Sequence, residues 1–135
     1  MPHLHLSIQH GNDLILKRMK RRHLARDVVR FVEQARKNRP GIVLGADFIS
    51  GFPTENGEAH LSSLKLINDL EICWGHIFPY SPRNGSPAAK MPQIESKLRK
   101  DRAKEVGDIN NFPNILDQPN NPKKRDIILP DCFFK

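Results

Sequence analysis

The sequence is poor in cysteine and in long apolar runs, and each shortage disfavours a class of protein. The 135 residues include two cysteines, Cys73 and Cys132, which stand far apart and form no Cys-X-X-Cys pair. We therefore expect two reduced thiols rather than a disulfide or a pair of metal ligands. No apolar run approaches the roughly 18 residues that a membrane span needs. The N-terminus also lacks the basic-then-apolar order of a signal peptide, so we expect a cytoplasmic protein without a membrane partner.

Acidic residues are also scarce, and the resulting positive charge is uneven. The chain has 22 Lys and Arg against 15 Asp and Glu, which gives a net charge of +7. The N-terminal 40 residues hold ten of the basic and three of the acidic residues, so the whole excess lies there. Five basic residues stand close together: Lys17, Arg18, Lys20, Arg21 and Arg22. This basic run is compatible with a solvated helix face and with a site for a phosphate backbone, although no aromatic residue among them could stack on bases.

Three short segments predict β-strands. Residues 42–49 are nearly continuously apolar, which is typical of a parallel strand covered on both faces. Residues 72–78 form another short apolar run. Residues 3–9, HLHLSIQ, alternate strictly between polar and apolar side chains. Their polar side fits a solvated edge strand, and it fits equally the interior of a barrel whose helices cover the apolar side.

Helical spacing of apolar residues fills the intervals between these strands. It predicts a short helix from residue 14, an amphipathic helix over 24–37, a third helix over 56–71 and a charged helix over 93–106. The proline-rich segment 79–91 is expected to be a loop. Strands that alternate with helices through short joints indicate βαβ units on a parallel sheet. Three such strands leave two unpaired edges, so the chain looks like part of a larger barrel.

The stretch GIVLGADFISGFPTE at residues 41–55 organises the chain. Its apolar run ends at a glycine turn with Gly51 and Pro53, after which the sequence becomes polar. In α/β folds, ligands bind in the loops that follow the carboxyl ends of strands. Glu55, just beyond this turn, is therefore a candidate site residue.

Four segments in this order resemble a known family: PHLHLSIQHGND, ILKRMKRRH, GADFISGFPTE and HIFPYSPRNGSPAAKM. They are similar to the second half of the radical S-adenosylmethionine core of tRNA methylthiotransferases, in the branch that modifies N6-threonylcarbamoyladenosine beside the anticodon. The resemblance implies an α/β fold, a radical SAM TIM-like barrel of six βα units with parallel strands. Residues 1–106 would form its last three units, and residues 107–135 a divergent, disordered tail.

The resemblance also implies cofactors and a substrate. The complete family enzyme binds S-adenosylmethionine and a [4Fe-4S] cluster through a CxxxCxxC motif after its first strand, and it adds a methylthio group to tRNA. That motif is absent from this sequence, and neither Cys73 nor Cys132 matches a ligand position. We therefore expect a fragment that cannot bind the cluster alone and that needs a chain carrying the missing N-terminal half. A decayed remnant, a non-catalytic tRNA-binding or anion-binding module and an edge-paired homodimer are the alternatives.

Eight residues match family positions around S-adenosylmethionine: Gln9, Gly51, Phe52, Pro53, Glu55, Phe78, Tyr80 and Ser81. A glycine turn allows close approach of the backbone, an amide both donates and accepts, and an aromatic rim packs on a purine. The basic run at residues 17–22 would contact tRNA, and His5 and His76 would face the barrel interior. No catalytic residue and no metal ligand is assigned. One departure is His10, which stands where a serine is usual.

Overall fold

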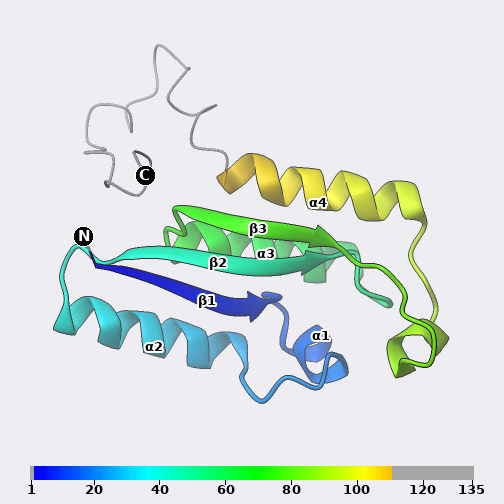
Figure 1. Cartoon of the computed structure of the whole chain (residues 1–135), viewed down its shortest axis with the longest axis horizontal. Coiled ribbons are helices and arrows are strands. Elements are labelled where there is room, and N and C mark those ends of the chain that lie inside the picture. The colour runs from blue at the N-terminus through cyan, green and yellow to red at the C-terminus, as the bar shows by residue number, and fades with distance from the viewer. Residues whose placement is uncertain (1, 111–135) are drawn as a thin grey trace, which may run out of the picture.

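The computed structural model describes residues 2–110, which form an α/β fold around a three-stranded parallel sheet. The strands are β1 (His3–Gln9), β2 (Val43–Ser50) and β3 (Trp74–Pro79), and β2 lies between the other two (Figure 1). Both strand pairs are parallel. This confirms the predicted partial, TIM-like arrangement of three βα units. The predicted boundary at residue 107 stays untested, and Cys132 lies outside the described residues.

Helices follow each strand, close to the predicted positions. They are α1 (Asp13–Arg18), α2 (Ala25–Asn38), α3 (Gly57–Asp69) and α4 (Ser96–Asn110). The predicted loop at 79–91 contains one short 3-10 helix, η1 (Pro87–Lys90), because the Ser86 side chain accepts a hydrogen bond from the Ala89 amide. Helix α4 starts later than predicted and continues past residue 106.

Asparagine caps explain where two helices begin. The Asn12 side chain accepts hydrogen bonds from the amides of Leu14 and Ile15 at the start of α1. The Asn56 side chain accepts one from the Ala59 amide at the start of α3, over 2.8 Å. Each cap satisfies amides that have no partner inside the helix and typically contributes about 1 kcal/mol.

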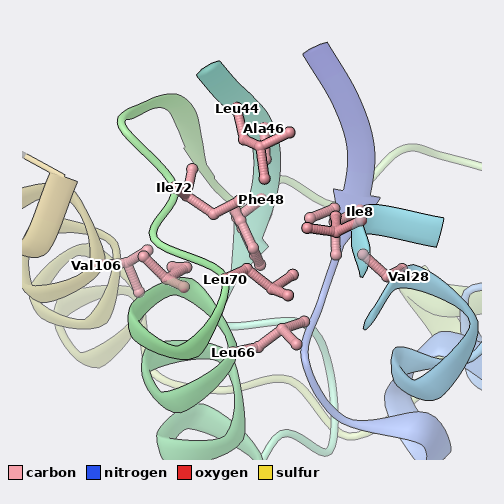
Figure 2. Close-up of a cluster of buried hydrophobic side chains, with 11 residues drawn as sticks. Ile8, Val28, Leu44, Ala46, Phe48, Leu66, Leu70, Ile72 and Val106 are labelled. Carbon is pink, nitrogen blue, oxygen red and sulfur yellow. The ribbon is translucent and has the colours of Figure 1, made fainter. Parts of the chain in front are cut away.

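The hydrophobic core lies between one face of the sheet and helices α2, α3 and α4. Figure 2 shows Phe48 of β2 directed toward Leu70, the residue after α3, with Leu66 of α3 beyond it and Val106 of α4 at one side. Phe48 is 1% exposed. The alternation of β1 thus places its apolar side on the core, as expected for strands covered by helices.

Some apolar residues of the predicted helix stripes do not reach this core. Phe31 of α2 and Leu61 of α3 are more than half exposed, although the spacing that predicts the two helices includes both residues. The apolar positions of each helix span a wider arc than the sheet surface covers, and Val32 and Ile67 occupy the central positions instead. No helix among residues 2–110 has the length and apolarity required to cross a membrane.

The opposite face of the sheet is polar and is not covered by a helix of the described chain. Side chains at alternate positions of the three strands gather there, including His5, Asp47 and His76. The outer edges of β1 and β3 have no strand partner among residues 2–110 (Figure 1). The polar face and the open edges have the form expected for one part of a barrel wall.

Candidate functional site

The carboxyl ends of the three strands meet at one edge of the sheet, because the strands are parallel. The Tyr80 amide donates to the Ser50 carbonyl over 2.8 Å, which fixes the chain leaving β3 beside the end of β2. The Phe52 ring lies against the Tyr80 ring in an edge-on contact with centroids 5.2 Å apart. The turn after β2 and the segment after β3 therefore form a single structural unit. We call this unit, together with the carboxyl ends of the three strands, the carboxyl edge.

A small apolar cluster holds this carboxyl edge together. Buried Phe52 packs with Ile15 of α1 and Ala59 of α3, and Tyr80 and Met91 lie against the cluster. Burial of a phenylalanine side chain contributes roughly 1.5–3 kcal/mol. The cluster joins segments that are far apart in the sequence and gives the turn a fixed position.

Gly51 has two independent reasons to be glycine. Its φ angle of 74° lies in the left-handed region, which residues with a Cβ rarely adopt. A Cβ at this position would lie 2.4 Å from Cγ of Arg99 and 2.9 Å from its Cα. The turn thus lies directly against α4, and its shape depends on the missing side chain.

Glu55 lies at the centre of a buried polar network. One carboxylate oxygen is 2.7 Å from Nε2 of His10, and the other accepts from Nη1 of Arg102 over 2.9 Å. The Gly51 amide also donates to the carboxylate. The side chains of His10 and Glu55 are 0% and 1% exposed, and that of Arg102 is 12% exposed. The network links the end of β1, the turn after β2 and helix α4.

The geometry also indicates where the proton of His10 lies. The Asn12 amide donates to Nδ1 of His10 over 3.0 Å, so Nδ1 acts as an acceptor and Nε2 carries the proton that points at Glu55. Burial acts to raise the pKa of Glu55. The hydrogen bond with His10, the charge of Arg102 and the Gly51 amide outweigh it and hold that pKa below its ordinary value of 4.5. Glu55 is therefore a carboxylate near neutral pH.

Two polar groups at the carboxyl edge lack partners in the described chain. No hydrogen bond to another described residue occupies the side chain of Gln9, although that residue is only 9% exposed. The Tyr80 hydroxyl is buried and has no hydrogen-bond partner among these residues. A buried polar group is rarely left unsatisfied, so the Tyr80 hydroxyl is suited to a ligand. The side-chain amide of Gln9 has no partner among the described residues and is available to a ligand as well.

The strict alternation predicted for β1 ends before Gln9. The register with β2 shifts between Leu6 and Gln9, and Gln9 has a φ angle of 74°. The residue after it, His10, then turns into the protein interior. A bulge of this kind aims side chains at a sheet end in directions that the strand period does not give.

The other predicted cofactor residues divide into two groups. Phe52, Pro53 and Glu55 are buried within the carboxyl edge and shape it from inside. Phe78 is 53% exposed and Ser81 is also exposed, so both present their side chains at the surface. The structure therefore brings Phe52 and Tyr80 into contact but does not bring Glu55 to the same surface as Phe78.

The basic run lies next to the carboxyl edge. All five of its residues, Lys17, Arg18, Lys20, Arg21 and Arg22, are exposed. The Arg18 guanidinium donates a hydrogen bond to the Thr54 hydroxyl, in the turn that follows β2. The strongest positive charge of the chain is thereby placed beside the candidate ligand site.

The residues present do not fit an iron-sulfur cluster. Such clusters are held mainly by several cysteine thiolates. The described chain has one cysteine, Cys73, whose Sγ lies 3.7 Å from the Glu71 carbonyl just before β3. It lies at the amino end of its strand, away from the carboxyl edge. No cluster ligand is therefore assigned.

Sequence reasoning missed three residues of these polar arrangements. It noted His10 only as an unusual residue, and it gave no role to Arg102 of α4 or to Asp47 of β2. Asp47 could have been found, because it is the only charged residue in the apolar run 42–49. Arg102 carried no such signal, because it is one of many charged residues on its helix.

Parallel strands with helices on one face and unpartnered polar groups at their carboxyl ends are the features expected of part of an α/β barrel. A profile of the radical SAM superfamily matches residues 1–67. The threonylcarbamoyladenosine tRNA methylthiotransferase of Rickettsia prowazekii is 52% identical over 104 residues, which is 77% of this chain and 25% of the relative. The tRNA-2-methylthio-N(6)-dimethylallyladenosine synthase of Paracoccus denitrificans is 42% identical over 106 residues, 78% of this chain and 24% of the relative.

The chain belongs to the radical SAM superfamily, and the relatives named above are tRNA methylthiotransferases. A further synthase of the second type, from a Ruegeria species, is 43% identical over 102 residues, 76% of this chain and 23% of the relative. The chain spans about a quarter of the length of the curated relatives it matches. The similarity therefore concerns the part of the radical SAM core that the three strands form.

Proposed function

We propose that this chain forms the later part of the radical SAM core of a tRNA methylthiotransferase that acts on threonylcarbamoyladenosine. The observation that carries this proposal is the 52% identity with the R. prowazekii enzyme over 104 residues. The identity with the dimethylallyladenosine synthases is lower, at 42% and 43%. The carboxyl edge supports the same proposal, because its unpartnered polar groups lie where barrel enzymes bind their substrates.

In this function the carboxyl edge binds S-adenosylmethionine. The unpartnered amide of Gln9 and the hydroxyl of Tyr80 hydrogen-bond the ligand, and the exposed ring of Phe78 packs on its adenine. Glu55 acts indirectly, because its carboxylate accepts a hydrogen bond from the Gly51 amide and so holds the turn in shape. When bound to its cluster, S-adenosylmethionine supplies the radical and methyl chemistry of the superfamily.

The cluster belongs to another segment, which pairs with the open edges of β1 and β3. This segment carries the cysteines that the chain lacks, either on a separate polypeptide or in a longer form of the protein. The unpaired outer edges of the described sheet support its existence, because exposed strand edges are normally paired or covered.

A chimaeric enzyme tests this function. In it, residues 1–106 of this chain replace the matching quarter of the R. prowazekii enzyme, and it is expressed in cells that lack their own methylthiotransferase. We expect 2-methylthio-threonylcarbamoyladenosine in the tRNA, measured by mass spectrometry of its nucleosides. A second chimaera, with the P. denitrificans synthase as host, controls for substrate choice.

The two chimaeras separate the class of enzyme from its substrate. Higher activity in the R. prowazekii background supports the threonylcarbamoyl assignment. Higher activity in the P. denitrificans background contradicts that substrate assignment but still supports a tRNA methylthiotransferase. Absence of any methylthio product in both, while each unmodified host enzyme is active, contradicts the proposed function.

A second candidate function is tRNA or anion binding without catalysis, and the exposed basic run beside the carboxyl edge favours it. Phosphate contacts make binding fall steeply with salt. We expect the purified chain to bind tRNA at low salt. Replacing Arg18, Arg21 and Arg22 with uncharged residues should weaken tRNA binding. It should also reduce the slope of log affinity against log salt concentration by roughly one for each phosphate contact that is lost.

A matched control removes equal charge elsewhere. Arg30, Lys37 and Arg39 are exposed along α2 and at its end, outside the basic run, so neutralising them should change binding much less. Equally weakened binding by both triple variants would indicate a non-specific charge effect. An edge-paired homodimer is the remaining alternative to a complementary segment, and light scattering that shows a monomer at all concentrations would contradict it.

A further inference from the structure

Two imidazoles and one carboxylate converge on the uncovered face of the sheet. Nε2 of His5 lies 2.8 Å from Oδ1 of Asp47, and Nδ1 of His76 lies 3.1 Å from the same oxygen. Each of the three residues comes from a different strand. Both rings therefore point at one atom, instead of forming a chain in which each group has its own partner.

The register of the parallel sheet produces this arrangement. Asp47 lies opposite His76, and His5 lies opposite Gly45, two residues before Asp47 on the same side of β2. A Cβ on Gly45 would be 2.8 Å from Nδ1 of His5 and 2.9 Å from Cε2 of Trp74. The glycine therefore makes room for the His5 ring to lie across the strand toward Asp47.

Hydrogen bonding alone does not satisfy this cluster. Nδ1 of His5 is buried and has no hydrogen-bond partner among the described residues. Oδ1 of Asp47 faces one ring nitrogen from each of the two histidines.

We propose that His5, Asp47 and His76 form a binding site for a divalent transition-metal ion of the zinc type. Two imidazole nitrogens and one carboxylate oxygen are a donor set that suits zinc and its neighbours, whereas calcium and magnesium prefer oxygen alone. A tetrahedral ion with bonds of 2.0–2.1 Å places its ligand atoms about 3.3 Å apart. Two of the three separations are already 2.8 and 3.1 Å, and all ligand atoms lie within 4.8 Å of one another.

The neighbouring histidine is not a fourth ligand. Nε2 of His3 accepts a hydrogen bond from the indole nitrogen of Trp74 over 2.9 Å, and the two rings are stacked. The ion would therefore keep an open position toward the uncovered face, as metal sites with three protein ligands do. Water or an oxygen of a small ligand could occupy it.

The metal site is separate from the carboxyl edge. Asp47 precedes Gly51 by four residues, and His5 precedes Gln9 by four. Four residues of a strand span roughly 13 Å. The proposed ligands on β1 and β2 thus lie deeper along their strands than Gln9 and Gly51. The third ligand, His76, lies closer to the proposed cofactor site, because its ring centroid is 6.2 Å from that of Phe78.

Metal titration of the full chain without an affinity tag tests the proposal. Zn²⁺ binding is measured by calorimetry, and Co²⁺ is used as a spectroscopic probe of the ligand geometry. We expect one ion per chain and a Co²⁺ absorption typical of low coordination number. His76→Gln should weaken Zn²⁺ binding by more than the roughly 10- to 100-fold loss that follows removal of a supporting hydrogen bond.

A matched control comes from the same face of the sheet. His3→Gln removes an exposed imidazole two residues from His5, and it should leave Zn²⁺ affinity unchanged. The His76 side chain is 58% exposed, so its variant keeps the fold, which circular dichroism can verify. Asp47→Asn removes a second ligand and should also weaken binding. No Zn²⁺ binding, or binding that His76→Gln and His3→Gln affect equally, would overturn the proposal.

Discussion

Replacing Glu55 with glutamine should strongly destabilise the fold. The wild-type carboxylate interacts with His10 at 2.7 Å, with Arg102 at 2.9 Å and with the Gly51 amide at 3.2 Å. Glutamine keeps the shape but has one oxygen to accept from these donors, and its amino group faces another donor. The Arg102 guanidinium then keeps its charge in a largely buried position without a carboxylate.

The magnitude follows from the burial of the pair. Removing one partner of a buried ion pair costs about 3–5 kcal/mol. Because glutamine retains one acceptor, we expect a loss of about 2–4 kcal/mol. This is a large share of the roughly 5–15 kcal/mol by which domains are stable. Urea unfolding followed by circular dichroism measures it as a shift in midpoint at a constant slope.

Glu33→Gln is the matched control, because Glu33 is an exposed carboxylate on α2 without an ion-pair partner among the described residues. Its free energy of unfolding should change by less than about 0.5 kcal/mol. If Glu55→Gln is equally mild, the buried network does not hold the carboxyl edge together. The reasoning that makes Glu55 a positioning residue would then be refuted.

Two further predictions concern the same edge. Because folding lowers the pKa of Glu55, the ionised carboxylate contributes its full stability above its ordinary pKa of 4.5, and this contribution is lost as the pH falls below that value. Urea midpoints measured from pH 6 to pH 3 should therefore fall more for the wild type than for Glu55→Gln. Parallel curves for the two proteins would contradict this. Gly51→Ala should cost more than about 1 kcal/mol, because of its positive φ and the contact with Arg99. Gly57→Ala, where a Cβ meets nothing, should instead be neutral or stabilising by the same unfolding assay.

Local patterns in the sequence predicted the elements and their order well. The apolar run of β2 and the alternation of β1 gave the strands, and the parallel sheet followed from the helices between them. Two of these helices begin at asparagine caps, Asn12 and Asn56, whose hydrogen bonds reach no further than three residues along the chain. Such features depend on neighbours in the sequence, so a single sequence contains them.

The buried network and the proposed metal site depend on tertiary contacts, which local patterns do not encode. His10 and Glu55 are 45 residues apart, and Glu55 and Arg102 are 47 apart. Their contact requires the path of three elements to be known. The resemblance placed Glu55 beside the adenosyl group, whereas its side chain here points inward to Arg102. The role of Glu55 in cofactor binding stays a prediction, and the hydrogen bond from the Gly51 amide is the contact through which Glu55 would exert it.

Exposure of apolar side chains was the other feature that the sequence could not give. Helical spacing put Phe31 and Leu61 on apolar stripes, but a stripe does not report how much of it the sheet covers. The bulge before Gln9 was also hidden, because HLHLSIQ alternates without interruption. Bulges arise from backbone geometry at the end of the strand and leave no fixed mark on the polar and apolar pattern.

S-adenosylmethionine binding by the R. prowazekii chimaera bears most directly on the carboxyl edge as the cofactor site. Gln9→Ala removes an amide that no described residue uses, so equilibrium dialysis should show weaker binding without loss of the fold. Gln34→Ala, on exposed α2, is the control and should bind like the unmodified chimaera. Equal affinity for all three proteins would contradict the proposed site.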